Sequence, residues 1–238
     1  MHSEGGFIGP TATLAALPSV VVYDDGRIFL PGAVDTIYPA PLLPTFSVHS
    51  VGAAGVQAIR DALRSAGLDV AGGGDTGVAA DTGTTVFEVV VNGQTVTTRF
   101  ANTGGGPRPG GSPAPAALDL LSRLTDPTET WGSTATQATL YPPTAYRVYT
   151  VPGAPAADPA APQTPMAWPL TTGLDAFGVP APVDRGIVGL RVGVVSGADA
   201  AVLAAFLAKA NVLTPVTSAG QSYTLYVRPL LPDESPGA

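Results

Sequence analysis

The alternation of apolar and polar positions predicts a series of short strands. Residues 19–23 (SVVVY) and 27–30 (RIFL) lie on either side of Asp24-Asp25-Gly26, where Gly accepts a positive φ, and they predict a hairpin. Residues 45–51 (TFSVHSV) alternate strictly, as expected of a strand with one buried face. The remaining predicted strands are 86–91 and 95–100, joined by a strong Asn-Gly hairpin turn, and 146–151, 190–195 and 223–228.

Apolar residues at helical spacing predict two main helices. In residues 52–66, Val56, Ile59 and Leu63 recur on one face while charged residues occupy the other, and Gly67 supplies the residue with positive φ that ends many helices. A second helix opens at Gly197 and runs to Ala210, and its apolar face is expected to hold Val202, Leu203, Phe206 and Leu207. A shorter helix is predicted over residues 116–124.

These elements predict an α+β fold of antiparallel sheets, each with one main amphipathic helix. Residues 47–68 and 191–212 both read as strand, Gly-Ala step and helix, which favours two related small lobes, by duplication or by convergence on one pattern. We expect an N-terminal α+β lobe over 1–125, a Pro/Ala-rich connecting segment with one strand over 126–185, and a C-terminal β-α-β lobe over 186–238. Within the connecting segment, regularly spaced prolines in 152–182 predict a polyproline-II-like linker or a loop laid over the surface.

Composition narrows the class of protein. The 238 residues include 29 Gly and 25 Pro, but 45% are hydrophobic, which is enough for a folded core. The net charge is −7 and the 11 Lys and Arg residues are scattered singly, which argues against nucleic acid or an anionic membrane surface as a partner. No apolar run reaches the ~18 residues of a membrane span. With no Cys and two His, thiol chemistry is excluded and histidine-based chemistry has little room.

The sequence motif that most resembles a catalytic one is a repeated Asp-Thr-Gly, at Asp75-Thr76-Gly77 and Asp81-Thr82-Gly83. This triplet is typical of aspartic proteases, in which two carboxylates about 3 Å apart share a proton. Here both copies lie in one loop, and the apolar strand that usually precedes the Asp is replaced by Gly or Ala. We therefore favour a turn-rich connector, with an aspartyl hydrolase as the alternative.

The other possible sites give weaker evidence of a function. Gly72–Gly77 matches G-x-G-x-x-G but follows a helix and precedes a strand, the reverse of a dinucleotide-binding turn. His49 is expected to be a surface strand residue, His2 lies near a free terminus, and Asp24, Asp25 and Asp35 lack a patterned calcium loop. We predict no catalytic residue, no cofactor-binding residue and no metal ligand.

Aromatic residues beside prolines are a further feature. We expect these side chains to be exposed and either to pin an extended loop onto its own domain, the favoured interpretation, or to form a shelf for a carbohydrate or peptide. They are Trp131, Tyr141, Tyr146, Tyr149 and Trp168.

Two parts of the sequence resemble those of known proteins. The first is Glu4-Gly5-Gly6-Phe7, Tyr23-Asp24-Asp25-Gly26-Arg27 and Leu30-Pro31-Gly32, and the second is Gly197-Ala198-Asp199-Ala200, Leu213-Thr214-Pro215 and 228–234 (RPLLPDE). Together they resemble a family of uncharacterised secreted or lipid-anchored proteins of actinobacteria and related high-GC bacteria. The resemblance implies a cell-envelope location, an export or lipidation signal upstream of Met1 and a first strand that ends at Glu4. It implies no activity.

A second resemblance covers residues 4–125. The order of a Gly-Gly-Phe turn, strand, helix, hairpin and short helix is similar to that of emfourin-like inhibitors of thermolysin-type metalloproteases. The chain departs from that plan by the hairpin over 20–30 and by its whole second half, so the resemblance assigns no inhibitory residue.

Three functions are therefore open. The favoured one is an extracytoplasmic, non-enzymatic binding or accessory protein whose partner is another protein of the cell envelope, such as a protease or a membrane complex. The first alternative is a protease inhibitor that inserts the loop 71–85 or 103–114 into a cleft. The second is the aspartyl hydrolase that would use Asp75 or Asp81.

Overall fold

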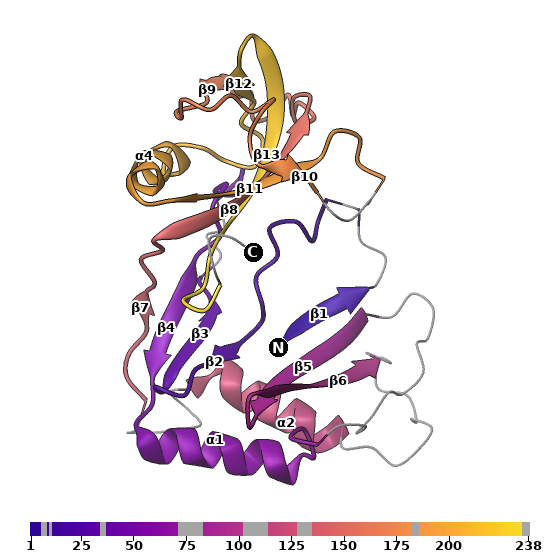
Figure 1. Ribbon diagram of the computed structural model, residues 1–238, viewed down its shortest axis with the longest axis vertical. Helices are drawn as coiled ribbons and strands as arrows, with labels where there is room; N and C mark the ends of the chain where they lie inside the picture. Colours follow the sequence, from indigo (N-terminus) through magenta and orange to yellow (C-terminus); the bar gives the residue numbers. More distant parts are fainter. Residues whose placement is uncertain are drawn as a thin grey trace. The chain divides into compact units, whose positions relative to one another are not determined.

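The computed structural model describes residues 1–5, 9, 11–33, 37–70, 83–101, 114–127, 135–181 and 186–234 (Figure 1). It confirms an α+β fold in which antiparallel strand pairs dominate. The chain divides into two compact units, and each is described by itself. None of the helices in the described part of the chain is long and apolar enough to cross a bilayer.

Unit 1 comprises Met1–Ile8, Leu17–Pro31 and Phe46–Tyr141, and it holds two sheets. One sheet has the order β1-β5-β6, with β1 (His2–Gly5), β5 (Gly83–Val91) and β6 (Gln94–Ala101) all antiparallel. The other has the order β2-β3-β4-β7, with β2 (Val21–Val22), β3 (Arg27–Pro31), β4 (Phe46–Ser50) and β7 (Thr139–Leu140). Both predicted hairpins of this region are confirmed, β2–β3 and β5–β6.

Two helices complete the core of unit 1, α1 (Ala53–Ser65) and α2 (Ala114–Thr125). Gly67 ends α1 as predicted, because its N–H donates to Arg64 O and the N–H of Leu68 donates to Leu63 O, the pair of bonds of a Schellman motif. The shared core brings residues of α1, α2 and both sheets together, including Ile28, Leu30, Val56, Ile59, Phe87, Phe100, Leu120 and Leu124.

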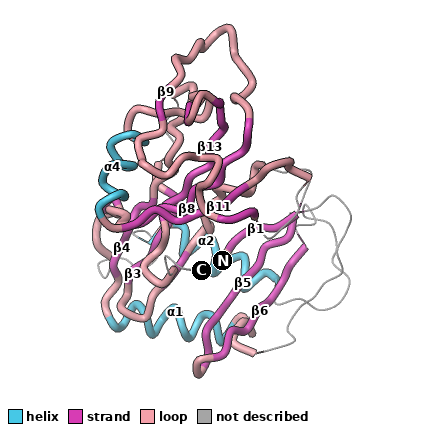
Figure 2. Tube along the Cα trace, turned by 45° about the horizontal axis from the view of Figure 1, so that its top comes forward, coloured by secondary structure: helices cyan, strands magenta, loops and turns pink. Residues whose placement is uncertain are grey.

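Unit 2 comprises Gly9–Ala16, Gly32–Thr45 and Pro142–Ala238, and it is built on one six-stranded sheet with the order β10-β11-β8-β13-β12-β9. Its long strands β8 (Ala145–Pro152), β11 (Arg191–Ser196) and β13 (Gln221–Pro229) lie side by side at the centre (Figure 2). The short strands are β9 (Met166–Ala167), β10 (Val179–Pro180) and β12 (Val216–Ser218). All neighbours are antiparallel except β9 and β12, which are parallel.

Helix α4 (Ala198–Leu207) covers one face of this sheet with Leu203, Phe206 and Leu207, which join the core formed by the central strands. Val202 was expected on the same face but is 45% exposed, because the buried positions of the helix are 200, 203, 206 and 207. The outward positions of α4 therefore include small or apolar residues, and the helix is less amphipathic than the sequence predicts.

Most described residues of 152–182 lie outside strands and are at least partly exposed, as expected of a surface loop, but part of the segment belongs to the sheet and the core. It supplies both β9 and β10 and three residues of the unit 2 core, Trp168, Leu174 and Phe177. The division of the chain also differs from the expected boundaries. Segments 9–16 and 32–45, expected in the N-terminal lobe, and residues 142–181 all belong to unit 2. The buried side chains of segment 152–182, Trp168, Leu174 and Phe177, are spaced irregularly along an extended chain. The helical or strand periodicity of the sequence therefore could not predict their burial.

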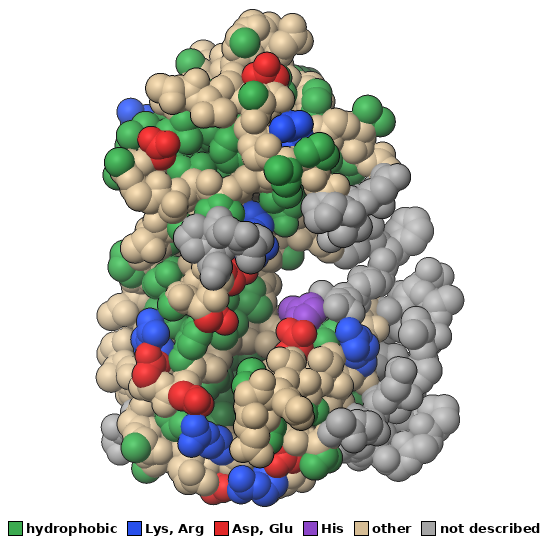
Figure 3. All heavy atoms as spheres, viewed as in Figure 1, with side chains coloured by type: hydrophobic (Ala, Val, Ile, Leu, Met, Phe, Trp, Pro, Cys, Tyr) green, Lys and Arg blue, Asp and Glu red, His purple; other side chains and the backbone are tan. Residues whose placement is uncertain are grey.

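Charged side chains are sparse on the molecule. On the face shown in Figure 3, the Lys and Arg side chains in view lie apart from one another, several of them beside Asp or Glu. This agrees with the ion pairs Arg60–Asp24 and Arg64–Asp61, both at 2.9 Å.

Candidate functional site

Of the two Asp-Thr-Gly copies, the described residues include Gly83, which begins β5. Asp75 and Asp81 lie outside the described residues, as do the Gly72–Gly77 stretch, Asp35 and Trp131. The same holds for the loop 103–114 up to residue 113, and for residues 71–82 of the loop 71–85.

The expectation that His49 lies on the surface is wrong. His49 is only 8% exposed within β4, and its Nδ1 lies 3.1 Å from the carbonyl oxygen of Thr136. A carbonyl only accepts, so Nδ1 carries the proton and the ring ties β4 to the neighbouring segment. The same segment is joined to β4 by two bonds between Ser50 and Thr136. His49 therefore holds structure together.

The other titratable candidates also have local partners. His2 Nδ1 lies 3.9 Å from a carboxylate oxygen of Glu88. Asp24 accepts a hydrogen bond from Arg60, and Asp25 accepts one from Arg27 at 2.7 Å in the β2–β3 turn. Within the described ranges, no group of three or more His, Cys, Asp or Glu residues is placed to hold a metal ion.

None of the four described aromatic residues is exposed as expected, because Tyr141 and Tyr149 are half-buried and Tyr146 and Trp168 are buried. Tyr146 and Trp168 are buried in the core of unit 2, because one lies on the α4 side of β8 and the other follows β9 directly. Tyr141 packs edge-on against Phe29 and Phe46. Trp168 thus pins the extended segment to its own unit, as the favoured interpretation predicts.

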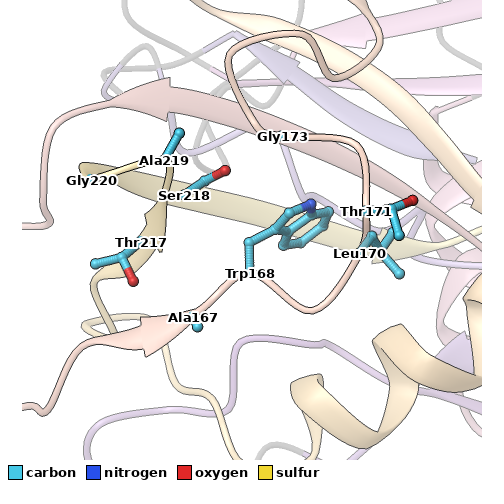
Figure 4. Close-up of a pocket in the computed structure, with 9 residues that line it drawn as sticks. All are labelled: Ala167, Trp168, Leu170, Thr171, Gly173, Thr217, Ser218, Ala219 and Gly220. Atoms are coloured by element: carbon cyan, nitrogen blue, oxygen red, sulfur yellow. The ribbon is translucent and has the colours of Figure 1, made fainter.

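A groove lies beside Trp168, at one end of the six-stranded sheet (Figure 4). Its cavity volume is about 630 Å³, within the range of small-ligand sites. It is lined by Ala167, Trp168, Leu170, Thr171, Gly173, Thr217, Ser218, Ala219 and Gly220. All nine belong to unit 2, so the groove forms within one compact body.

Two segments build the walls of this groove. One is the hairpin of β12 and β13, whose two-residue turn places both Ala219 and Gly220 at positive φ, +49° and +78°. The other is the loop that follows β9. The two walls are joined where the Oγ of Ser218 accepts a hydrogen bond from the N–H of Leu174, at 3.0 Å.

The indole of Trp168 is held on several sides. Its ring lies edge-on to Phe177 and Phe206, with centroid distances of 5.7 and 6.2 Å. Its Nε1–H donates to the carbonyl oxygen of Thr172 at 2.9 Å. With 8% of its surface exposed, Trp168 contributes a small, fixed apolar area to the groove.

The nine residues that line the groove carry no charge, but a carboxylate oxygen of Asp175 lies beside Gly173, 2.6 Å from where a Cβ of that glycine would be. The lining side chains are apolar or carry hydroxyls, and none is a carboxylate, ammonium, guanidinium or imidazole. The hydroxyl of Ser218 already accepts a backbone hydrogen bond, and that of Thr217 lies 3.4 Å from the Met166 carbonyl. General acid–base chemistry requires a titratable group within reach, and these nine residues supply none. The arrangement can bind an uncharged group and orient it.

Comparison with protein-family models, with curated proteins and with solved structures finds no match for this chain. The evidence that the groove is a binding site is therefore its geometry. Sequence reasoning singled out Trp168 through its neighbouring prolines but missed 217–220. The signal there was the short apolar-polar alternation on either side of Ala219-Gly220, because the turn itself has no typical turn residue at position 219.

Proposed function

We propose that this protein is a non-enzymatic binding protein of the cell envelope, and that the groove beside Trp168 holds an extended, uncharged segment of a protein partner. The envelope location rests on the family resemblance of the sequence. The binding function rests on the groove.

The observation that carries the proposal is an open groove of about 630 Å³ with an uncharged lining on a rigidly packed base. Because Trp168 is fixed by two aromatic rings and a hydrogen bond, little ordering is needed when a ligand enters. Because the lining carries no charge, a carboxylate buried there would be unpaired and would lie near the negative side chain of Asp175. The groove therefore favours neutral groups over acidic ones.

A protein segment fits this groove better than a carbohydrate does. Sugars stack on an open aromatic face, whereas Trp168 is mostly covered by its neighbours. The groove also adjoins β9, a strand at the end of the sheet order, and sheet edges are a common docking place for extended peptides.

The test uses peptides selected from a random display library on the immobilised full chain. Affinity of a selected peptide is then measured for the wild type and for Thr171→Trp, which places a large ring in the groove. We expect Thr171→Trp to weaken binding at least about tenfold, a loss of ~1.4 kcal/mol.

Thr144→Trp is the matched control. Thr144 is also an exposed threonine of unit 2, and it precedes β8 at the end of the β8–β13 pair away from Gly220. It should leave the affinity unchanged. The proposal is overturned if no peptide is selected, if Thr171→Trp binds like the wild type, or if a neutral oligosaccharide displaces the peptide from the groove.

A further inference from the structure

In strand β9, the backbone groups of successive residues point alternately toward the neighbouring strand β12 and away from it. The N–H of Met166 donates to Pro215 O at 2.9 Å, and the N–H of Trp168 donates to Thr217 O at 2.8 Å. Residues 166 and 168 therefore face β12. In an extended chain the groups of successive residues point to opposite sides, so the N–H and C=O of Ala167 point away from β12.

Prolines flank this outward-facing residue on both sides. Positions 165 and 169 share the outward orientation of Ala167 along an extended chain, but both are proline and have no N–H. Of the five residues from 165 to 169, Ala167 is thus the one with an N–H directed outward. Prolines at a sheet edge normally prevent uncontrolled strand pairing, and here they leave one position open between them.

Ala167 combines that open position with a place in the groove. It is exposed, and it lines the cavity together with Trp168 and Thr217 (Figure 4). A segment that hydrogen-bonds to Ala167 would therefore lie along the β9 rim of the groove, on the side of β9 away from Thr217, and a neighbouring side chain would reach over β9 into the groove.

We propose that β9 pairs with a single residue of the partner segment, through two hydrogen bonds exchanged with the N–H and C=O of Ala167, while an adjacent uncharged side chain fills the groove. This rests on the proposed function and adds its mode of recognition. The pairing residue needs its own N–H, so proline is rejected at that position. The two hydrogen bonds set the register of the segment, and the groove selects its side chain.

The first test uses the free protein. Amide hydrogen exchange of the full chain, followed by NMR, compares three successive residues of β9. We expect the amide of Ala167 to exchange at least about tenfold faster than those of Met166 and Trp168, since only the latter two donate within the sheet. Equal protection at Ala167 would overturn the pairing mode, whether or not a peptide ligand is known.

The second test uses a library-selected peptide whose backbone amides are methylated one at a time. One position should be sensitive, with a loss of affinity of at least about tenfold, and methylation at the other positions should cost little. Binding of the unmodified peptide should also slow exchange at Ala167. A peptide that competes for the groove but has no sensitive position contradicts the pairing mode and leaves the proposed function standing. If no peptide binds, both fail.

Discussion

The guanidinium of Arg228 and the carboxylate of Glu234 form a two-point ion pair near the end of the chain. Nη1 donates to Oε2 at 2.8 Å and Nη2 to Oε1 at 2.5 Å, while the N–H of Leu231 donates to the same Oε2 at 2.8 Å. Desolvation raises the pKa of Glu234, but these donors and the nearby positive charges outweigh it and lower the pKa below its ordinary value of 4.5. The ionised carboxylate therefore stabilises the fold.

Replacing Glu234 by Gln should reveal that contribution as a pH-dependent loss. The folded pKa is depressed, so the stabilisation is fully present above the unfolded value and is lost as the pH falls through the folded one. At neutral pH we expect Glu234→Gln to lower the free energy of unfolding by about 1 to 2 kcal/mol, between exposed and fully buried pairs. The difference from wild type should shrink as urea unfolding is repeated at falling pH.

The exposed pair of Asp61 and Arg64 provides the control. Asp61→Asn should change the free energy of unfolding by less than about 0.5 kcal/mol at neutral pH. A Glu234→Gln effect that stays constant from neutral to strongly acidic pH would show that the charge of Glu234 is not its source.

Gly26 lies where no side chain fits. A Cβ there would meet the carbonyl oxygen of Val51 at 2.1 Å, its φ is +90°, and its own carbonyl accepts the N–H of Val51. Gly26→Ala must separate the β2–β3 turn from the end of β4, and we expect it to lower the free energy of unfolding by at least about 2 kcal/mol.

Gly67→Ala separates the two causes of that loss. Gly67 has a similar positive φ of +66°, but a Cβ there meets nothing within 4 Å. It should cost only the backbone strain, about 1 kcal/mol in thermal or urea unfolding. Equal losses at the two positions would mean that the contact with Val51 contributes nothing.

The two-residue turns show what sequence reasoning could and could not predict. Asn92-Gly93 identified the β5–β6 hairpin at once, because Asn and Gly both accept positive φ. Ala219-Gly220 makes a turn with nearly the same two positive φ values, yet Ala rarely adopts that conformation, and the sequence did not predict the β12–β13 hairpin. The wall of the groove was therefore not predictable from turn chemistry, whereas the long strands and α1 were.

That unusual alanine leads to a stabilising change. Ala219 has a φ of +49°, which costs an L-residue with a Cβ more than it costs glycine. After subtracting the greater chain entropy of glycine, Ala219→Gly should raise the free energy of unfolding by about 0.5 to 1 kcal/mol. Asn92→Gly, at a φ of +52°, is the control and should change it by less than about 0.5 kcal/mol, since Asn tolerates this region. A destabilised Ala219→Gly would refute the argument.

Leu174 tests whether the proline-spaced segment belongs to the folded core. Its side chain is 0% exposed, and it lies in the core cluster with Trp168 and Phe177. The composition predicted a linker here because the segment is rich in proline. Its burial depends instead on a few apolar side chains that pack against the sheet. We expect Leu174→Ala to lower the free energy of unfolding by about 2 to 5 kcal/mol, as for other buried leucines. Val188→Ala, which truncates a 91% exposed side chain, should change it by less than about 0.5 kcal/mol. If both variants unfold at the same urea concentration as wild type, the segment contributes no core and the base of the groove is not rigid.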